Sequence, residues 1–160
     1  MVVHTDAPCE RVDRIEVHLS RADSPRITQS LVFVRDECMA SGGRQDHHTQ
    51  LNTAAGLRLG VQDSRASDAR LHAEVIGRHG IDVVGSAVGE TDFVDNKVYA
   101  LPVSLDAVCF DVAAQCAAGA TCRADPQTGA ATCVPVYHAP GTGTAGAGLT
   151  VDLAAGDGGT

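Results

Sequence analysis

The sequence contains no tryptophan, and only 3% of its residues are aromatic. A folded core must therefore be built from Val, Leu, Ile and Ala. The hydrophobic content of 44% is high enough to exclude wholesale disorder. Carbohydrate-binding sandwiches generally use exposed Trp or Tyr rings as stacking platforms. With Tyr99 and Tyr137 as the only tyrosines, that function has little support.

Concentrated positive charge is also missing. The formal net charge is −8 at pH 7, and the 12 Lys and Arg residues are scattered along the chain. Nucleic-acid backbones and anionic lipid head groups both bind clustered cations. The sequence therefore argues against nucleic acid and acidic membrane surfaces as partners.

Long apolar runs are absent as well. No stretch reaches the length of about 18 residues that a membrane-spanning helix needs, so we expect no membrane span. Met1-Val2-Val3-His4 offers neither the basic region nor the apolar region of a signal peptide. We therefore expect the signal segment to be missing from this sequence. At 160 residues the chain has room for one domain with appendages.

Six cysteines are present, and four of them, at positions 109, 116, 122 and 133, follow the spacing C-x6-C-x5-C-x10-C. Zinc sites usually take ligands from C-x2–4-C pairs, and no such pair occurs here. The stretch also lacks apolar residues for a core of its own, so a disulfide framework fits it better. A disulfide framework predicts an extracytoplasmic protein, either secreted or anchored at the outer surface. We therefore expect this sequence to be a trimmed or mis-started form of that protein. The alternatives are free thiols in a cytosolic protein and a zinc site formed by the four thiolates.

Period-two alternation of apolar and polar residues predicts a series of short strands. The predicted strands cover residues 12–20, 27–35, 57–61, 69–78, 81–88, 97–105 and 132–137. Turn signals recur between them, and no amphipathic helix is evident. This pattern predicts an all-β fold, an antiparallel β-sandwich of the immunoglobulin or transthyretin type.

The same pattern divides the chain into four parts. Residues 1–10 are expected to form a lead-in, 11–106 the sandwich and 107–138 a cysteine-rich hook. Residues 139–160 form a Gly-rich linker and tail, in which residues 149–153 could form a short strand.

The run Cys116-Ala-Ala-Gly-Ala-Thr-Cys122, followed after ten residues by Cys133-Val134, resembles an EGF-like hook of the pattern C-x-x-G-x-x-C…C-V. In such hooks the first cysteine pairs with the third and the second with the fourth. The resemblance therefore implies the disulfides Cys109–Cys122 and Cys116–Cys133. A full EGF module has six cysteines, so its third bridge is missing here.

A wider resemblance includes the strand Leu101-Pro102-Val103-Ser104-Leu105, which runs into this hook. A β-rich domain that ends in an L-P-x-x-L strand and such a hook is similar to surface lipoproteins of myxobacteria and related bacteria. The likeness covers roughly residues 10 to 135 and is specific only in its last third. It implies a location at the cell surface rather than an activity.

Cys9 and Cys38 are the two remaining cysteines. By elimination they would pair with each other. Such a bridge would join the N-terminal lead-in to the end of the second predicted strand, which an antiparallel sheet allows.

Asp46, His47 and His48 form the only dense cluster of metal-ligating residues. Adjacent histidines on a strand point to opposite faces, so both reach one ion only from an irregular loop. A third ligand would have to come from His72 or His4. We favour a solvated polar loop, because two histidines rarely suffice for a site.

The predicted loop 89–96 contains Glu90, Asp92 and Asp95, whose carboxylates are ligands that calcium prefers. The Gly and terminal Glu of an EF-hand are missing, and Asp95-Asn96 is also a good turn pair. We expect no cofactor, with calcium or zinc as the alternatives.

None of the motifs that resemble catalytic or cofactor-binding sequences has the flanking structure that its chemistry needs. Gly141-x-Gly143-x-x-Gly146 matches a dinucleotide fingerprint but lacks the preceding strand and following helix. The run 85–89, GSAVG, places its serine directly after a glycine, out of register with a nucleophile elbow.

We predict a non-catalytic structural or interaction module of a secreted or cell-surface bacterial protein. We expect it to be monomeric, with an unidentified protein or envelope component as partner. The alternative is a metal-binding protein or metal-dependent enzyme that uses the loop 46–48.

Overall fold

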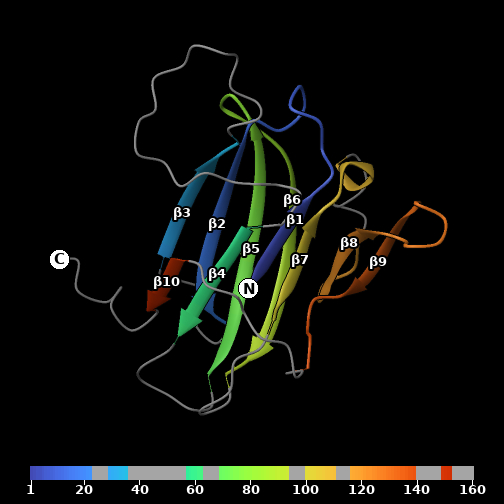
Figure 1. The fold of residues 1–160 in the computed structure, drawn as a ribbon. Coiled ribbons are helices and arrows are strands. Elements are labelled where there is room, and N and C mark those ends of the chain that lie inside the picture. The colour runs from blue at the N-terminus through green and yellow to red at the C-terminus, as the bar shows by residue number, and fades with distance from the viewer. Residues whose placement is uncertain are drawn as a thin grey trace.

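The computed structural model describes residues 1–22, 29–35, 57–62, 69–93, 100–110, 116–139 and 149–152. These residues form two four-stranded sheets that pack face to face and a separate two-stranded hairpin beside them (Figure 1). The fold is therefore the predicted β-sandwich with a small C-terminal hook, residues 107–138. Its elements are β1 (Val2–Thr5), β2 (Arg14–Arg21), β3 (Gln29–Val34), β4 (Leu57–Gln62), β5 (Arg70–His79), β6 (Asp82–Asp92), β7 (Pro102–Leu105), the short 3-10 helix η2 (Ala107–Cys109), β8 (Ala120–Ala124), β9 (Ala131–Pro135) and β10 (Leu149–Asp152).

The first sheet has the order β3-β2-β5-β6 and is antiparallel throughout. Its inward positions carry apolar side chains that are almost fully buried, as the alternation predicts. On β2 and β5 these are Ile15, Val17, Leu19, Leu71, Ala73 and Val75. The polar residues between them face outward. Local sequence therefore determines which face of this sheet forms the core.

The second sheet has the order β10-β4-β1-β7 and is mixed. Strand β1 runs antiparallel to β4 but parallel to β7, and β10 runs parallel to β4. Pro102 begins β7 at the edge of this sheet, which is the position predicted for a proline that cannot donate to a ladder. Leu149–Asp152 form the short strand that was predicted at 149–153.

The N-terminal residues correct the prediction of a lead-in at 1–10. Val2–Thr5 form β1 in the middle of the second sheet, and the side chains of Met1 and Val3 are buried. The Met1 ammonium donates to the Leu59 carbonyl at 2.6 Å. Only four residues pair here, which is too short a run for alternation to be recognised. Their strand is formed by long-range pairing with β4 and β7.

Small residues on the inner face of β6 let the second sheet and the hook approach closely. Gly85, Ala87 and Gly89 share this face because every second residue of a strand points the same way. A Cβ on Gly89 would lie 2.8 Å from Cγ2 of Val103 on β7. The run GSAVG is therefore a packing feature of the sandwich.

The hook is tied by the two disulfides that the EGF-like resemblance implied. Cys109–Cys122 and Cys116–Cys133 join Cα atoms that are 5.7 and 5.6 Å apart. The first bridge is buried, whereas Cys133 of the second is exposed. Each bridge closes a loop of 13 or 17 residues, which contributes about 3 kcal/mol in the chain-entropy model.

Of the two cysteines in the third predicted disulfide, only Cys9 lies among the described residues. Cys9 is disulfide-bonded. Cys38 lies outside the described residues, so the pairing Cys9–Cys38 stays a prediction.

Candidate functional site at the junction of the hook and the sandwich

The hook docks on the outer edge of β6 through hydrogen bonds of the β6 main chain. The Val88 amide donates to Thr121 Oγ1 at 3.1 Å. Farther along, the Glu90 amide donates to the Val136 carbonyl and the His138 amide donates to the Glu90 carbonyl, each at 2.7 Å. Residues 136–138 thereby add to β6 as a short parallel bridge. The hook thus covers backbone groups that an edge strand would otherwise expose.

The base of the hook is anchored by two aspartates and one aromatic ring. Asp6 Oδ1 accepts from the Ala107 amide at 2.6 Å, and Asp106 Oδ2 accepts from the Ala124 amide at 2.7 Å. The Phe110 ring lies against β6 at Gly85, where a Cβ would come within 2.5 Å of the ring. The Arg11 guanidinium, from the segment before β2, lies over this ring, with Cζ 4.9 Å from the ring centroid.

A polar cluster fastens the last residues of the hook to the outer face of the first sheet. The Tyr137 hydroxyl donates to Asp92 Oδ2 at 2.7 Å, and Arg70 Nε donates to Asp92 Oδ1 at 2.9 Å. The Arg70 guanidinium also lies over the Tyr137 ring, 4.6 Å from its centroid. The hydrogen bonds from Tyr137 and Arg70 lower the pKa of Asp92, and the bond to Asp92 raises the pKa of Tyr137. These hydrogen bonds therefore favour the ionised form of Asp92 and the neutral form of Tyr137.

The predicted calcium ligands Glu90 and Asp92 belong to this cluster. The sequence predicted that both residues lie in a loop, but in the structure they lie on strand β6. His72, predicted as a distal metal ligand, contacts Glu90 Oε1 through Nδ1 at 2.8 Å. Because Arg70 lies beside both carboxylates, it supplies the positive charge that a cation would bring.

The other predicted metal ligands do not join this cluster within the described part of the chain. His4 lies on β1 in the other sheet, and Asp46, His47, His48 and Asp95 lie outside the described residues. Among the residues that the structure describes, no three His, Cys, Asp or Glu side chains are grouped so that they could hold a metal ion. The metal alternative thus stays a prediction.

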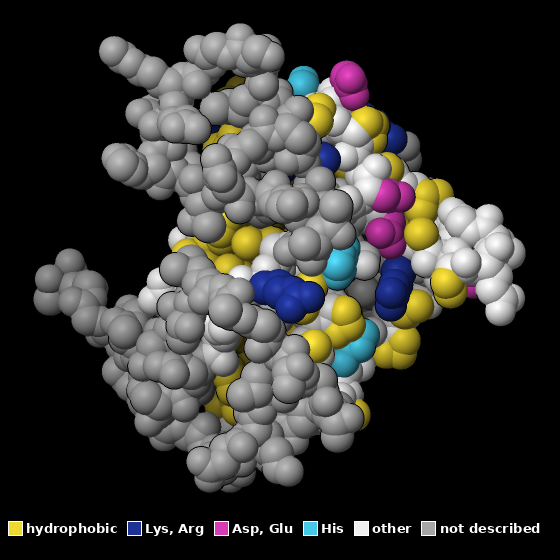
Figure 2. All heavy atoms as spheres, in the orientation of Figure 1, with side chains coloured by type: hydrophobic (Ala, Val, Ile, Leu, Met, Phe, Trp, Pro, Cys, Tyr) yellow, Lys and Arg dark blue, Asp and Glu magenta, His cyan; other side chains and the backbone are white. Residues whose placement is uncertain are grey.

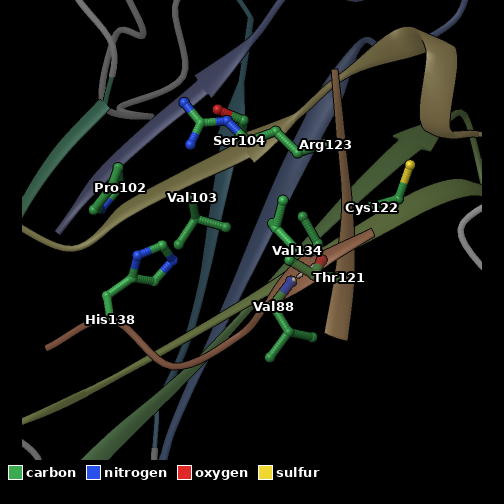
Figure 3. Close-up of a pocket in the computed structure, with 10 residues that line it drawn as sticks. Val88, Pro102, Val103, Ser104, Thr121, Cys122, Arg123, Val134 and His138 are labelled. Carbon is green, nitrogen blue, oxygen red and sulfur yellow. Dashed lines mark hydrogen bonds between the residues drawn. The ribbon is translucent and has the colours of Figure 1, made fainter. Parts of the chain in front are cut away.

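The contact between the hook and the second sheet leaves almost no space. A cavity of about 10 Å³ lies there, bounded by β6, β7 and the hook (Figure 3). That volume holds about one water molecule. Arg123 and His138 both line it, and burial together with the charge of Arg123 lowers the pKa of His138. His138 is therefore held in its neutral form in this junction.

A larger hollow lies between β6 and β8. It measures about 360 Å³, at the lower end of the range for ligand pockets. Its described lining carries no charged side chain and consists of Val83, Val84, Gly85, Ser86, Val88, Phe110, Ala120, Thr121 and Cys122. Within this lining Val83 is 57% exposed, and Ile81, in the preceding turn, is 88% exposed. The hollow thus combines an uncharged surface with a strand edge.

The turn that presents Ile81 is held by side chains of β2, β5 and the segment before β2. The Gly80 amide donates to Asp13 Oδ2 at 2.9 Å, and Arg14 donates to the Gly80 carbonyl. Arg78 Nη1 donates to the Ile81 carbonyl at 3.0 Å. Gly80 itself has φ of +59°, which favours glycine at this turn. The exposed Ile81 is therefore carried by a fixed turn.

Cationic side chains are dispersed on the face drawn in Figure 2. There the Arg side chains of the described residues lie apart from one another and do not gather into one basic patch. Within the described ranges, no helix has the length and apolar character required to cross a bilayer.

Comparisons with models of protein families, with curated proteins and with solved structures give no match to this chain. The site must therefore be interpreted from its own geometry.

Sequence reasoning singled out Glu90, Asp92 and His72 as possible metal ligands but did not predict that they face the hook, and it did not single out Phe110. Phe110 and Tyr137 are two of the few aromatic residues; Phe110 directly follows Cys109, and Tyr137 lies four residues after Cys133. The closeness of these two rings to the cysteines was one signal that could have indicated the junction. The small residues Gly85, Ala87 and Gly89 were a second signal, because alternating small side chains leave room on one face of a strand.

Proposed function

We propose that this chain is a non-catalytic structural or interaction module of a secreted or cell-surface bacterial protein. The observation that carries the proposal is a hook that two disulfides cross-link and that docks on the edge of β6. Disulfides of this kind persist in oxidising compartments and are rare in the cytosol. The resemblance of the hook and its preceding strand to bacterial surface lipoproteins supports the same location.

The surface chemistry of the described residues supports interaction rather than catalysis. The titratable cluster of Arg70, His72, Glu90, Asp92 and Tyr137 lies on the outer face of a sheet, and its members pair with one another. The hollow between β6 and β8 is lined by uncharged residues. General acid–base catalysis needs a titratable group within reach of a bound substrate. The 360 Å³ hollow therefore offers no titratable side chain from its described lining, and the 10 Å³ cavity beside His138 is too small for a substrate.

The first test of the proposal is the state of the cysteines in the natural protein. Protein recovered without reductant from cells, envelope and medium is alkylated before or after reduction, and each product is weighed. We expect all six cysteines to resist alkylation until reduction, and the protein to occur in the envelope or medium. Six free thiols in the protein as isolated would overturn the export proposal.

The second test concerns the interaction role. The variant Cys116→Ser/Cys133→Ser opens the exposed bridge of the hook and leaves the buried Cys109–Cys122 bridge in place. We expect association with the envelope fraction to fall severalfold in this variant relative to the wild type and to Ser86→Ala. If neither the wild type nor the variant associates with an envelope component, and deletion leaves the envelope unchanged, the proposal fails.

A further inference from the structure

The edge of β6 that the hook covers continues beyond the hook. The amides of Val88 and Glu90 point away from β5, because both bond to the hook. Backbone groups alternate in direction along a strand, and the register with β5 is regular from Gly85 to Thr91. The N–H and C=O of Ser86 therefore point to the same side. Within the described residues, no backbone group pairs with Ser86 on that side.

The hollow lies directly beside this open edge. Val84 and Ser86 line its β6 side, Ala120 and Thr121 its β8 side, and the Phe110 ring also lines it. Because its described lining has no charge, a charged side chain placed there would lose hydration without gaining a partner. The chemistry of the hollow therefore favours uncharged side chains.

The same edge already accepts an extended segment. Residues 136–138 of the hook pair with β6 in parallel at Glu90, immediately beyond Val88. A second extended segment at Val84–Ser86 would continue that interface along one strand. The walls are preformed, because disulfides tie the hook and side-chain bonds hold the turn at Gly80. Preformed walls reduce the ordering cost of binding.

We propose that the β6 edge at Val84–Ser86 binds an extended, uncharged segment of a partner protein by β-strand addition. Main-chain hydrogen bonds at Ser86 supply pairing, and the hollow against Phe110 receives alternate side chains of the segment. The inference rests on the proposed function as an interaction module and names the chemistry of its partner.

The test uses the oxidised full chain, labelled with 15N, and the peptide acetyl-Ser-Thr-Val-Thr-Val-Thr-Ser-amide. We expect saturable shifts confined to residues 83–88, 110 and 120–122, and slower exchange of the Ser86 amide proton. A peptide methylated at all of its backbone nitrogens keeps its side chains but loses its donors on both edges, so its binding should be about tenfold weaker. Equal binding of the methylated peptide, or shifts centred elsewhere, would overturn strand addition.

A matched pair of variants tests the edge itself. Ser86→Pro removes the outward N–H but no donor to β5, and Pro is tolerated where an edge N–H faces away from the ladder. Ser86→Ala retains the N–H and reports the effect of losing the hydroxyl alone. We expect Ser86→Pro to bind the peptide about tenfold more weakly than Ser86→Ala does. If Ser86→Pro does not fold, the methylated peptide still decides the outcome on the unaltered protein.

The remaining outcomes separate this inference from the proposed function. Absence of peptide binding up to millimolar concentration overturns strand addition, as does self-association of the chain through this edge in sedimentation. Wild-type envelope association in the Ser86→Pro variant overturns the inference and leaves the proposed function standing. Free cysteines in the natural protein overturn the proposed function, whatever the peptide does.

Discussion

The packing of Phe110 on Gly85 gives a sharp prediction about what holds the hook to the sandwich. In Gly85→Ala the new Cβ would lie 2.5 Å from Cδ1 of the ring and 3.0 Å from Cε1. Real Cβ atoms do not approach so closely, so the ring must move away from β6. Overpacking of this kind costs about 1–3 kcal/mol. We therefore expect Gly85→Ala to lower the free energy of unfolding by that amount.

The test is a double-mutant cycle with Phe110→Ala. Without the ring, the Cβ has room, and replacing a strand Gly with Ala becomes neutral or stabilising by about 0.5–1 kcal/mol. The two substitutions should therefore couple by about 1–3 kcal/mol. The free energy of unfolding is measured by guanidinium titration of each chain with its disulfides intact.

Gly89→Ala is the matched control. It also lies on the inner face of β6, but its Cβ would meet Val103 at 2.8 Å rather than Phe110. Its cost should be the same with and without the Phe110 ring. If Gly85→Ala costs the same in both backgrounds, the ring does not lie on Gly85 and this account of hook docking is wrong.

Three further predictions concern reduction and titration. Mild reductant should open the exposed Cys116–Cys133 bridge before the buried one, and timed alkylation with peptide mapping would show the order. Burial lowers the pKa of the Met1 ammonium from 8.0, so the unfolded chain binds more protons between the lowered pKa and 8.0. Stability should rise with pH through that window, and one added residue before Met1, making its amine an amide, should abolish the rise in thermal melts. Tyr137→Phe removes the largest cause of the lowered pKa of Asp92, so a carboxyl NMR titration should show that pKa rising; an unchanged value would contradict the hydrogen bond.

The strands of the first sheet were predictable because their pattern is local. Leu71, Ala73 and Val75 alternate with polar residues, and that alternation decides which face is buried whatever the strand pairs with. The turn at Gly80 was predictable for the same kind of reason, since a residue that takes positive φ marks a tight turn. The hook pairing was predictable only through its resemblance to EGF-like hooks. Four cysteines alone allow three pairings.

The strand at Val2–Thr5 was missed because its pairing partners are far away in the chain. Four residues carry too little alternation, and β7, its parallel neighbour, begins at Pro102. The acidic segment at 89–92 was misplaced for a related reason. Its polar residues are typical of a loop, but pairing with β5 and with residues 136–138 keeps them in a strand.

The order of residues along the chain was sufficient to establish an all-β sandwich, a cysteine-rich hook and the absence of clustered positive charge. These properties depend on composition and on side-chain periodicity over a few residues. The chain order alone did not establish that Phe110 lies on Gly85, that Tyr137 bonds Asp92, or that β6 keeps an open edge beside an uncharged hollow. Those contacts join segments separated by 25 to 45 residues in the sequence. They exist because the docking of the hook places two distant segments on one strand edge, and no local preference encodes that placement.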